Sequence, residues 1–155
     1  MKIRQAKSDD ASLILSFIHK KSEFDRSIGA FTGVLQVSED KVRHTLFGTT
    51  PFAYVLLAES AEKQLGFALY GFRYSSFIGQ PSIWLDDLYV NEDCRSQGVG
   101  AALMAQLAYI AQEKDCTHIA WNADARNQRG LSFYQELGAT ITDQQGNRCF
   151  LRWVQ

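Results

Sequence analysis

Residues Arg95 to Gly100, with the sequence RSQGVG, form the motif in this chain most suited to binding a ligand. They lie between a predicted strand over 82–90 and a predicted long helix over 98–113. Glycine lets the backbone approach a ligand closely, and the first N–H groups of a helix have no partners within it. Together with the positive end of the helix dipole and the charge of Arg95, these donors are typical of a pyrophosphate site. On local sequence alone, a tight glycine turn is the alternative.

Two other phosphate-binding motifs do not fit this loop. The dinucleotide fingerprint of a Rossmann fold needs a third glycine or an alanine three residues after Gly100, where this chain has Leu103. A Walker loop needs Gly-Lys-Ser/Thr, which the chain lacks. Neither nucleotide-binding class is therefore predicted.

Two carboxylates and one phenol are the next candidates for chemistry. Asp86 and Asp87 interrupt the otherwise apolar run SIWLDDLYV. Neighbours in a regular strand point to opposite faces, so at most one of the two is expected to face a ligand. Tyr134 lies on a predicted short helix over 129–137, and a phenol stays protonated at neutral pH, available as an acid. The alternatives are ordinary strand-end carboxylates and a packing aromatic, and packing is the preferred interpretation for Phe133.

Hydrophobic periodicity predicts the elements that position these residues. Ala11, Ile14, Leu15 and Ile18 have the spacing of one buried helix face, after the capping residues 8–10. A second helix begins at Ser38 and ends near Gly48, and residues 24–37 are predicted as loop. The predicted strands are 3–6, 52–59, 65–74, 82–90, 117–123 and 148–154. The order β-α-α-β-β-β-α-β-α-β indicates an α/β fold, a mixed sheet with helices on both faces.

Length and charge narrow the class of protein. The 155 residues suit one domain over 1–155 with a single core. Sixteen Lys and Arg stand against 17 Asp and Glu, for a formal charge of −1. A nucleic-acid-binding domain usually carries a basic excess on one face, so nucleic acid is not an expected partner.

Cysteine spacing and hydropathy indicate the compartment. Cys94, Cys116 and Cys149 make no Cys-x-x-Cys pair and stand near no histidine pair, so we expect free thiols and no metal site. The N-terminus has no apolar stretch of signal-peptide length, and runs such as 52–58 are too short to span a bilayer. We expect a cytoplasmic protein without a membrane partner.

Three separated motifs resemble those of the GCN5-related N-acetyltransferases (GNAT). Arg95-x-x-Gly98-x-Gly100 after IWLDDLYV resembles the acetyl-CoA motif of that superfamily. Asn127, Ser132-Phe133-Tyr134 and Leu137-Gly138-Ala139 resemble its later motif, and the similarity extends from Ile3-Arg4 almost to the end of the chain. Residues 66–90 are similar to the matching stretch of the diamine (spermidine/spermine) and thialysine N-acetyltransferases.

The resemblance implies a mostly antiparallel mixed sheet whose bulged fourth strand splays from the fifth, with acetyl-CoA as co-substrate and no metal. Pantetheine would lie along the splayed strand, whose N–H groups can also polarise the thioester carbonyl. Asn127 would bind the pantetheine arm or simply cap its helix. The implied cofactor-binding residues are Leu88, Tyr89, Val90, Arg95, Ser96, Gln97, Gly98, Val99, Gly100, Ala101, Asn127 and Gly130.

The resemblance also implies roles at the acceptor. Asp86 matches a glutamate that attracts the amine and accepts its proton. Since aspartate is one methylene shorter, a bridging water is expected. Tyr134 matches the tyrosine that protonates the departing thiolate. For the acceptor itself, Asp25 matches a substrate-contacting glutamate, with Glu23 as the alternative. The implied substrate-binding residues are Asp25, Trp84, Asp86, Trp121 and Asn122.

The predicted function is acetyl transfer from acetyl-CoA to the primary amine of a small molecule, a polyamine, diamine or thialysine-like amino acid, by direct attack. A protein lysine or N-terminal acetyltransferase and a non-catalytic acyl-CoA sensor are the alternatives. The resemblance further implies a homodimer whose two subunits shape the acceptor groove. The apolar C-terminal residues Phe150, Leu151, Trp153 and Val154 belong either to that interface or to the core. No role is assigned to His19, His44 or His118.

Overall fold

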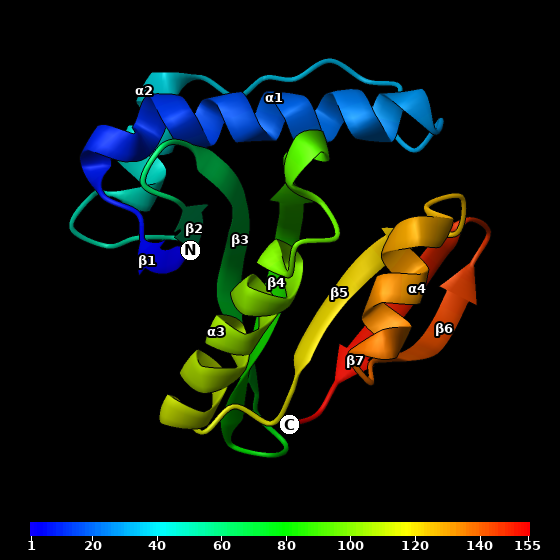
Figure 1. Cartoon of the computed structure of the whole chain (residues 1–155). Coiled ribbons are helices and arrows are strands. Elements are labelled where there is room, and N and C mark those ends of the chain that lie inside the picture. The colour runs from blue at the N-terminus through cyan, green and yellow to red at the C-terminus, as the bar shows by residue number, and fades with distance from the viewer.

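Seven strands form one sheet in the order β1-β2-β3-β4-β5-β7-β6 in a computed structural model that describes residues 1–155 (Figure 1). The strands are β1 (Lys2–Gln5), β2 (Tyr54–Glu59), β3 (Gln64–Ser75), β4 (Gln80–Val90), β5 (Ile119–Asp124), β6 (Thr140–Gln145) and β7 (Arg148–Trp153). Every neighbouring pair is antiparallel except β4 and β5, which are parallel. The sheet is therefore mixed and mostly antiparallel, as predicted.

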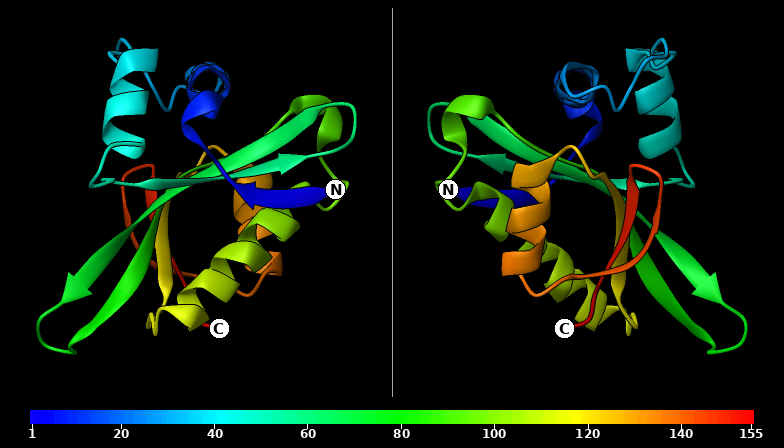
Figure 2. Two further views of the ribbon diagram at one scale, coloured as in Figure 1. Left: turned by 90° about the vertical axis from the view of Figure 1, so that its left-hand side faces the viewer. Right: turned by 90° about the vertical axis from the view of Figure 1, so that its right-hand side faces the viewer.

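Helices cover both faces of the sheet (Figures 1 and 2). The helices are α1 (Ala11–Ser27), α2 (Glu39–Leu46), α3 (Val99–Glu113) and α4 (Gln128–Glu136). In β2, Val55 and Leu57 pack with the α1 and α2 side chains, whereas Leu56 and Ala58 belong to the larger core beneath α3 and α4. This alternation within one strand gives two apolar layers, because successive strand residues face opposite sides. The predicted α/β fold is confirmed.

The central strand β4 is bulged and splays away from β5. Opposite β3, Leu85 pairs with Tyr70 and Asp87 pairs with Leu69, so Asp86 is the extra residue of a bulge. β4 and β5 pair only at Ile83–Ile119 and Trp84–Ala120, and beyond these positions they diverge toward α1 (Figure 1). The bulge and the splay expected from the family resemblance are both present.

Two sequence predictions about the elements are wrong. The loop predicted over 24–37 begins later, because α1 continues to Ser27. The strand β6 was not predicted, since its sequence TITDQQ is exposed along its whole length and has no apolar alternation. It forms as the partner of β7 at the edge of the sheet. The Ser38 cap is confirmed: the hydroxyl of Ser38 accepts a hydrogen bond from the Lys41 N–H.

The C-terminal strand contributes to the core rather than only to a surface. Leu151 is fully buried in the larger apolar cluster, and Trp153 packs against that cluster. Val154, just beyond β7, is exposed. No helix is long and apolar enough to cross a membrane, and no three His, Cys, Asp or Glu side chains are grouped closely enough to hold a metal ion.

Candidate active site

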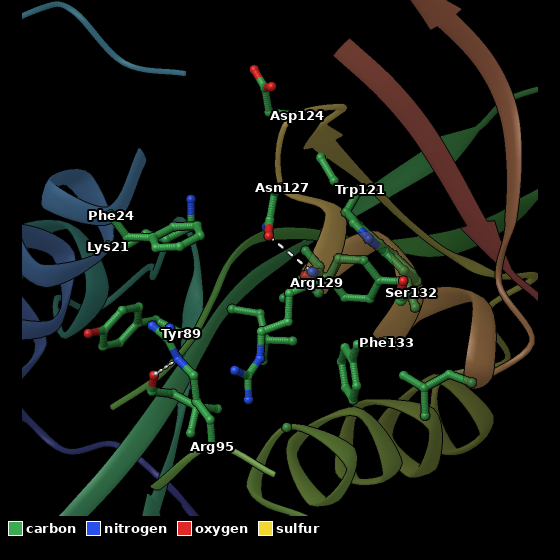
Figure 3. Close-up of a pocket in the computed structure, with 18 of the residues that line it drawn as sticks. Lys21, Phe24, Tyr89, Arg95, Trp121, Asp124, Asn127, Arg129, Ser132 and Phe133 are labelled. Atoms are coloured by element: carbon green, nitrogen blue, oxygen red, sulfur yellow. Dashed lines mark hydrogen bonds between the residues drawn. The ribbon is translucent and has the colours of Figure 1, made fainter. Parts of the chain in front are cut away.

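A cavity of about 940 Å³ opens where β4 and β5 diverge, between α1 on one side and α3 and α4 on the other (Figure 3). Most residues predicted from the sequence meet there. The predicted residues that line it are Asp25, Asp86, Leu88, Tyr89, Val90, Arg95, Ser96, Gly98, Val99, Gly100, Ala101, Trp121, Asn122, Asn127, Gly130 and Tyr134. The topology thus gathers residues from α1, β4, β5 and the starts of α3 and α4.

Four candidate residues from the sequence do not line this cavity: Gln97, Trp84, Glu23 and Asp87. Gln97 turns back, and its side-chain amide donates to the Asp93 carbonyl. Trp84 lines a second hollow of about 290 Å³, with the Arg73 guanidinium 3.6 Å from its ring centroid. Glu23 is exposed on α1, so Asp25 rather than Glu23 reaches the cavity. Asp86 lines both hollows and lies at their junction.

Residues 96–101 present a run of free backbone donors to the cavity. None of their N–H groups donates to another backbone or side-chain atom, and the first paired one beyond them is that of Ala102, bonded to the Gly98 carbonyl at 3.0 Å. Gly98 precedes α3 with φ of +83°, a conformation that favours glycine. Nothing lies within 4 Å of the position a Cβ would take there. The loop therefore aims free N–H groups into open space at a helix N-terminus, as a pyrophosphate site requires.

Arginines add positive charge around this loop. The Arg95 guanidinium lies against the rings of Phe24 and Tyr89, and its Nε donates to the Val90 carbonyl at 3.0 Å. Arg129, on the first turn of α4, donates to the Ser96 hydroxyl at 2.9 Å and also lines the cavity. Sequence reasoning missed Arg129, although its place two residues after Asn127 was a usable signal.

Two glycines in this wall have packing roles. A Cβ on Gly100 would lie 3.1 Å from the Phe133 ring, so the glycine lets that ring pack on α3. A Cβ on Gly130 would collide with the Asn127 amide. Asn127 Oδ1 accepts from the Gly130 N–H at 3.0 Å and caps α4, which leaves the Asn127 amide nitrogen as its free donor.

Lys21, Asp25 and Asp86 line the α1 end of the cavity, and the carboxylate of Asp87 lies near Lys21 without lining the cavity itself. Lys21 Nζ lies 2.5 Å from Asp25 Oδ2 and 4.0 Å from Asp87 Oδ1. Asp87 is 22% exposed at its side chain, and burial raises the pKa of its carboxyl to about 6. The nearby Lys21 lowers that pKa and the neighbouring Asp86 and Asp25 raise it, but burial is the largest effect. Asp86, by contrast, is exposed at the bulge.

Tyr134 lies in the wall between the loop and the carboxylates. It is only 9% exposed, and its ring is 4.9 Å from that of Trp121. Burial raises the pKa of its hydroxyl far above the usual value, and the charges of Asp87 and Asp25 raise it further. The phenol is therefore protonated across the physiological pH range. The buried Trp121 Nε1 has no hydrogen-bond partner in the protein.

Lys21 and the position of Asp87 beside it are not predicted from the sequence. A lysine in the middle of an amphipathic helix looks like any solvated side chain, and nothing local shows that it meets β4. Regular alternation already predicts different environments for Asp86 and Asp87, but the sequence does not show that Asp86 is the unpaired residue of a bulge.

The fold is that of known acetyltransferases. The solved structure of the PaiA N-acetyltransferase from Thermoplasma acidophilum, in complex with coenzyme A, superimposes with a TM-score of 0.75 over 99% of this chain and 98% of that one. The sequences are 14% identical, so this similarity establishes the fold alone.

Sequence comparison gives the family. The model of the Acetyltransferase (GNAT) family matches residues 23–139, so the chain belongs to that family and is an acetyltransferase. A thialysine N-epsilon-acetyltransferase of Bos taurus is 33% identical over 96% of this chain and 89% of its own length. A spermidine/spermine N(1)-acetyltransferase-like protein of Homo sapiens is 28% identical over 88% of this chain, a region that makes up 20% of that longer protein.

Proposed function

We propose that this protein transfers the acetyl group of acetyl-CoA to the primary amine of a small molecule, a diamine, polyamine or thialysine-like amino acid. One observation carries the proposal: a single cavity has free N–H donors and arginines at one end, and carboxylates with a buried phenol at the other. The names of the bovine and human relatives, which act on thialysine or resemble a polyamine acetyltransferase, support the choice of acceptor class.

The loop end fits the diphosphate and pantetheine of acetyl-CoA. The N–H groups of residues 96–101 bind phosphate oxygens, and Arg95 and Arg129 supply the opposing charge. Beyond the bulge, Leu88 to Val90 pair with β3 but not with β5, and apart from the Val90 carbonyl, which accepts from Arg95, their peptide groups on that side are free for a pantetheine amide. Acetyl-CoA contributes the activated thioester, and the remaining steps belong to side chains of the protein.

The acceptor end handles the amine and its proton. An alkylamine has a pKa of about 10.4, taking lysine as the guide, so it arrives as an ammonium ion. Asp86 and Asp25 attract that ammonium, and Asp86 accepts its proton through water. Tyr134 donates its phenolic proton to the sulfur that leaves as the new C–N bond forms. Asn122 lines the same cavity and contacts the rest of the acceptor, whereas Trp84 contacts the acceptor only if the acceptor extends past Asp86 into the second hollow.

A second candidate for the base is Asp87. A carboxyl with a pKa of about 6 is a stronger base than an ordinary carboxylate and is still mostly ionised at pH 7. Its charge is also close enough to raise the pKa of Tyr134. Asp86 lines the cavity, so we propose it as the amine-binding carboxylate and proton acceptor. Asp87 is the alternative base.

The test is turnover of acetyl-CoA, read as free thiol, with spermidine, spermine, diaminopropane, thialysine, lysine and a lysine-containing peptide. We expect turnover with at least one small amine. Preference for the peptide by a factor of ten or more would replace the proposal with a protein acetyltransferase. Tight binding of acetyl-CoA with no turnover across the panel would favour the non-catalytic sensor.

We also propose that the protein is a cytoplasmic homodimer. Its three cysteines are unpaired, which suits a reducing compartment. Exposed apolar side chains at the turn between β3 and β4, including Phe77 and Ile78, are typical of a protein–protein contact.

A further inference from the structure

Lys21 is a cation placed among the carboxylates of the acceptor end. It lines the cavity together with Asp25 and Asp86, and Figure 3 draws it beside Phe24 along the wall formed by α1. Its ammonium lies 2.5 Å from the Asp25 carboxylate and 4.0 Å from that of Asp87. The side chain is 24% exposed, so this ion pair is partly shielded from water. An ammonium of the protein therefore already occupies the place between two carboxylates.

This placement changes what the acceptor end can recognise. Without Lys21, the carboxylates Asp25 and Asp87 would bind a second ammonium of a diamine. With Lys21 between them, a second ammonium would meet a like charge at short range, which disfavours its binding.

The Lys21 ammonium also has N–H donors without a partner in the protein. An ammonium has three N–H donors. Asp25 takes one of them, and the 4.0 Å separation from Asp87 is too long for a hydrogen bond. The remaining donors face a cavity, where a ligand carboxylate would find a charged partner.

Resting on the proposed acetyltransferase function, we propose that Lys21 is a specificity-determining residue: it binds the carboxylate of an amino acid whose side-chain amine is acetylated, and it repels the second ammonium of a diamine. The acceptor class that fits this end is then a zwitterionic amino acid with a terminal amine. Polyamines, which carry only positive charge, fit it less well.

The sharpest test compares two acceptors that differ only in the carboxylate. Lysine and 1,5-diaminopentane, its decarboxylated counterpart, are compared by kcat/KM in the wild type and in Lys21→Met. We expect the wild type to prefer lysine and the variant to lose at least about tenfold of that preference, about 1.4 kcal/mol. Lys21→Arg keeps the charge and is expected to keep the preference.

A matched control is available on the same helix. Lys20 is exposed, and its ammonium donates to the Asn91 side chain at 3.2 Å rather than lining the cavity. Lys20→Met removes the same charge from α1 and is expected to leave the lysine-to-diamine ratio unchanged. If Lys21→Met does not fold, Lys21→Gln serves in its place, since the amide retains a donor for Asp25.

The outcomes separate this inference from the proposed function. A ratio in Lys21→Met within twofold of the wild type overturns the inference even if the overall rate falls, because a merely structural lysine would slow both acceptors alike. A wild type that prefers the diamine overturns it as well. If neither acceptor is turned over, the proposed function is decided by the wider panel of amines. Calorimetric binding of the same two compounds to the protein saturated with coenzyme A then decides the inference by itself, with preferential binding of lysine supporting it and equal binding overturning it.

Discussion

Asp86 and Asp87 are neighbours in the sequence, but the bulge gives them different surroundings. Asp86, as the extra residue, has no partner on β3 and is exposed at the junction of two hollows. Asp87 returns to the regular pairing and is largely buried near Lys21, with a pKa of about 6. Two adjacent carboxylates in different environments can divide binding and proton transfer between them.

The pH dependence of kcat/KM distinguishes the two carboxylates. If Asp87 is the base, the rate rises with pH through about 6, because only the ionised form accepts a proton. Asp87→Asn then removes that limb, whereas Asp86→Asn lowers the rate but leaves the limb in place. Loss of the limb in Asp86→Asn alone would assign the base to Asp86. The profiles are measured by thiol release between pH 5 and pH 9. Each rate is corrected for the fraction of the amine that is deprotonated at that pH.

The buried carboxyl of Asp87 is expected to make the free energy of unfolding depend on pH. Its folded-state pKa of about 6 lies above the ordinary aspartate value of 3.8, so between these values the folded state binds more protons than the unfolded state. Stability is therefore lost as the pH rises from about 4 to about 6, by at most about 3 kcal/mol from the 1.36 kcal/mol per pKa unit. We expect Asp87→Asn to raise Tm at pH 8 relative to the wild type and to have little effect at pH 4. A variant less stable than the wild type at pH 8 would contradict this.

Removal of the Tyr134 hydroxyl tests its proposed role as the proton donor to the leaving thiolate. Tyr134→Phe keeps the ring packed on Trp121 and removes only the hydroxyl. We expect kcat to fall by about 10²- to 10⁴-fold, the usual contribution of a positioned acid, with the Kd for acetyl-CoA nearly unchanged. Rate and affinity are measured by thiol release and calorimetry. Unchanged turnover would exclude Tyr134 as the proton donor.

At the scale of elements, the loop before α3 has two residues with positive φ, Ser96 at +60° and Gly98 at +83°. Gly98 has a positive φ and open space at its Cβ position, and Gly146, in the turn between β6 and β7, shares both properties. Gly98→Leu and Gly146→Leu therefore carry a similar backbone strain, but only the first places a side chain in the cavity.

We expect Gly98→Leu to weaken acetyl-CoA binding at least about tenfold, about 1.4 kcal/mol, because its side chain blocks the path of the phosphates. Both variants are expected to lower Tm by similar amounts, but Gly146→Leu is expected to leave the affinity for acetyl-CoA unchanged. Isothermal titration calorimetry and thermal unfolding measure the two effects. Equal affinity in both variants would remove the loop from the binding site.

The elements differ in how far the sequence predicts them. The phosphate loop and Asp86 give local signals in the sequence, namely glycine spacing and charge in an apolar strand, whereas Tyr134 is singled out by the family resemblance. β6 could not be predicted, because an edge strand exposed on every residue has no hydrophobic pattern and forms only by pairing with β7. The position of Lys21 beside Asp87 arises from the packing of α1 on the splayed sheet, and no local pattern reports such a contact.

At the scale of the whole molecule, the sheet forms two features outside the hydrophobic core, a cavity and a protruding hairpin. One is the cavity between β4 and β5, lined from both faces of the sheet. The other is the hairpin of β3 and β4, which extends away from the helices (Figure 2). At its turn Phe77 is fully exposed, and Tyr74 and Ile78 are 72% and 59% exposed. Apolar side chains grouped in this way are unfavourable in water and are commonly covered by a second chain.

Replacing the apolar residues of this turn tests the proposed homodimer. We expect Phe77→Ser combined with Ile78→Ser to raise the dimer dissociation constant at least about tenfold, because the pair would lose its burial against the second copy. Sedimentation equilibrium measures the constant. Val34→Ser, at an exposed apolar residue in the loop between α1 and α2, is the matched control and is expected to leave it unchanged. A wild type that stays monomeric at high concentration would exclude the dimer, and a double variant as dimeric as the wild type would place its interface elsewhere on the molecule.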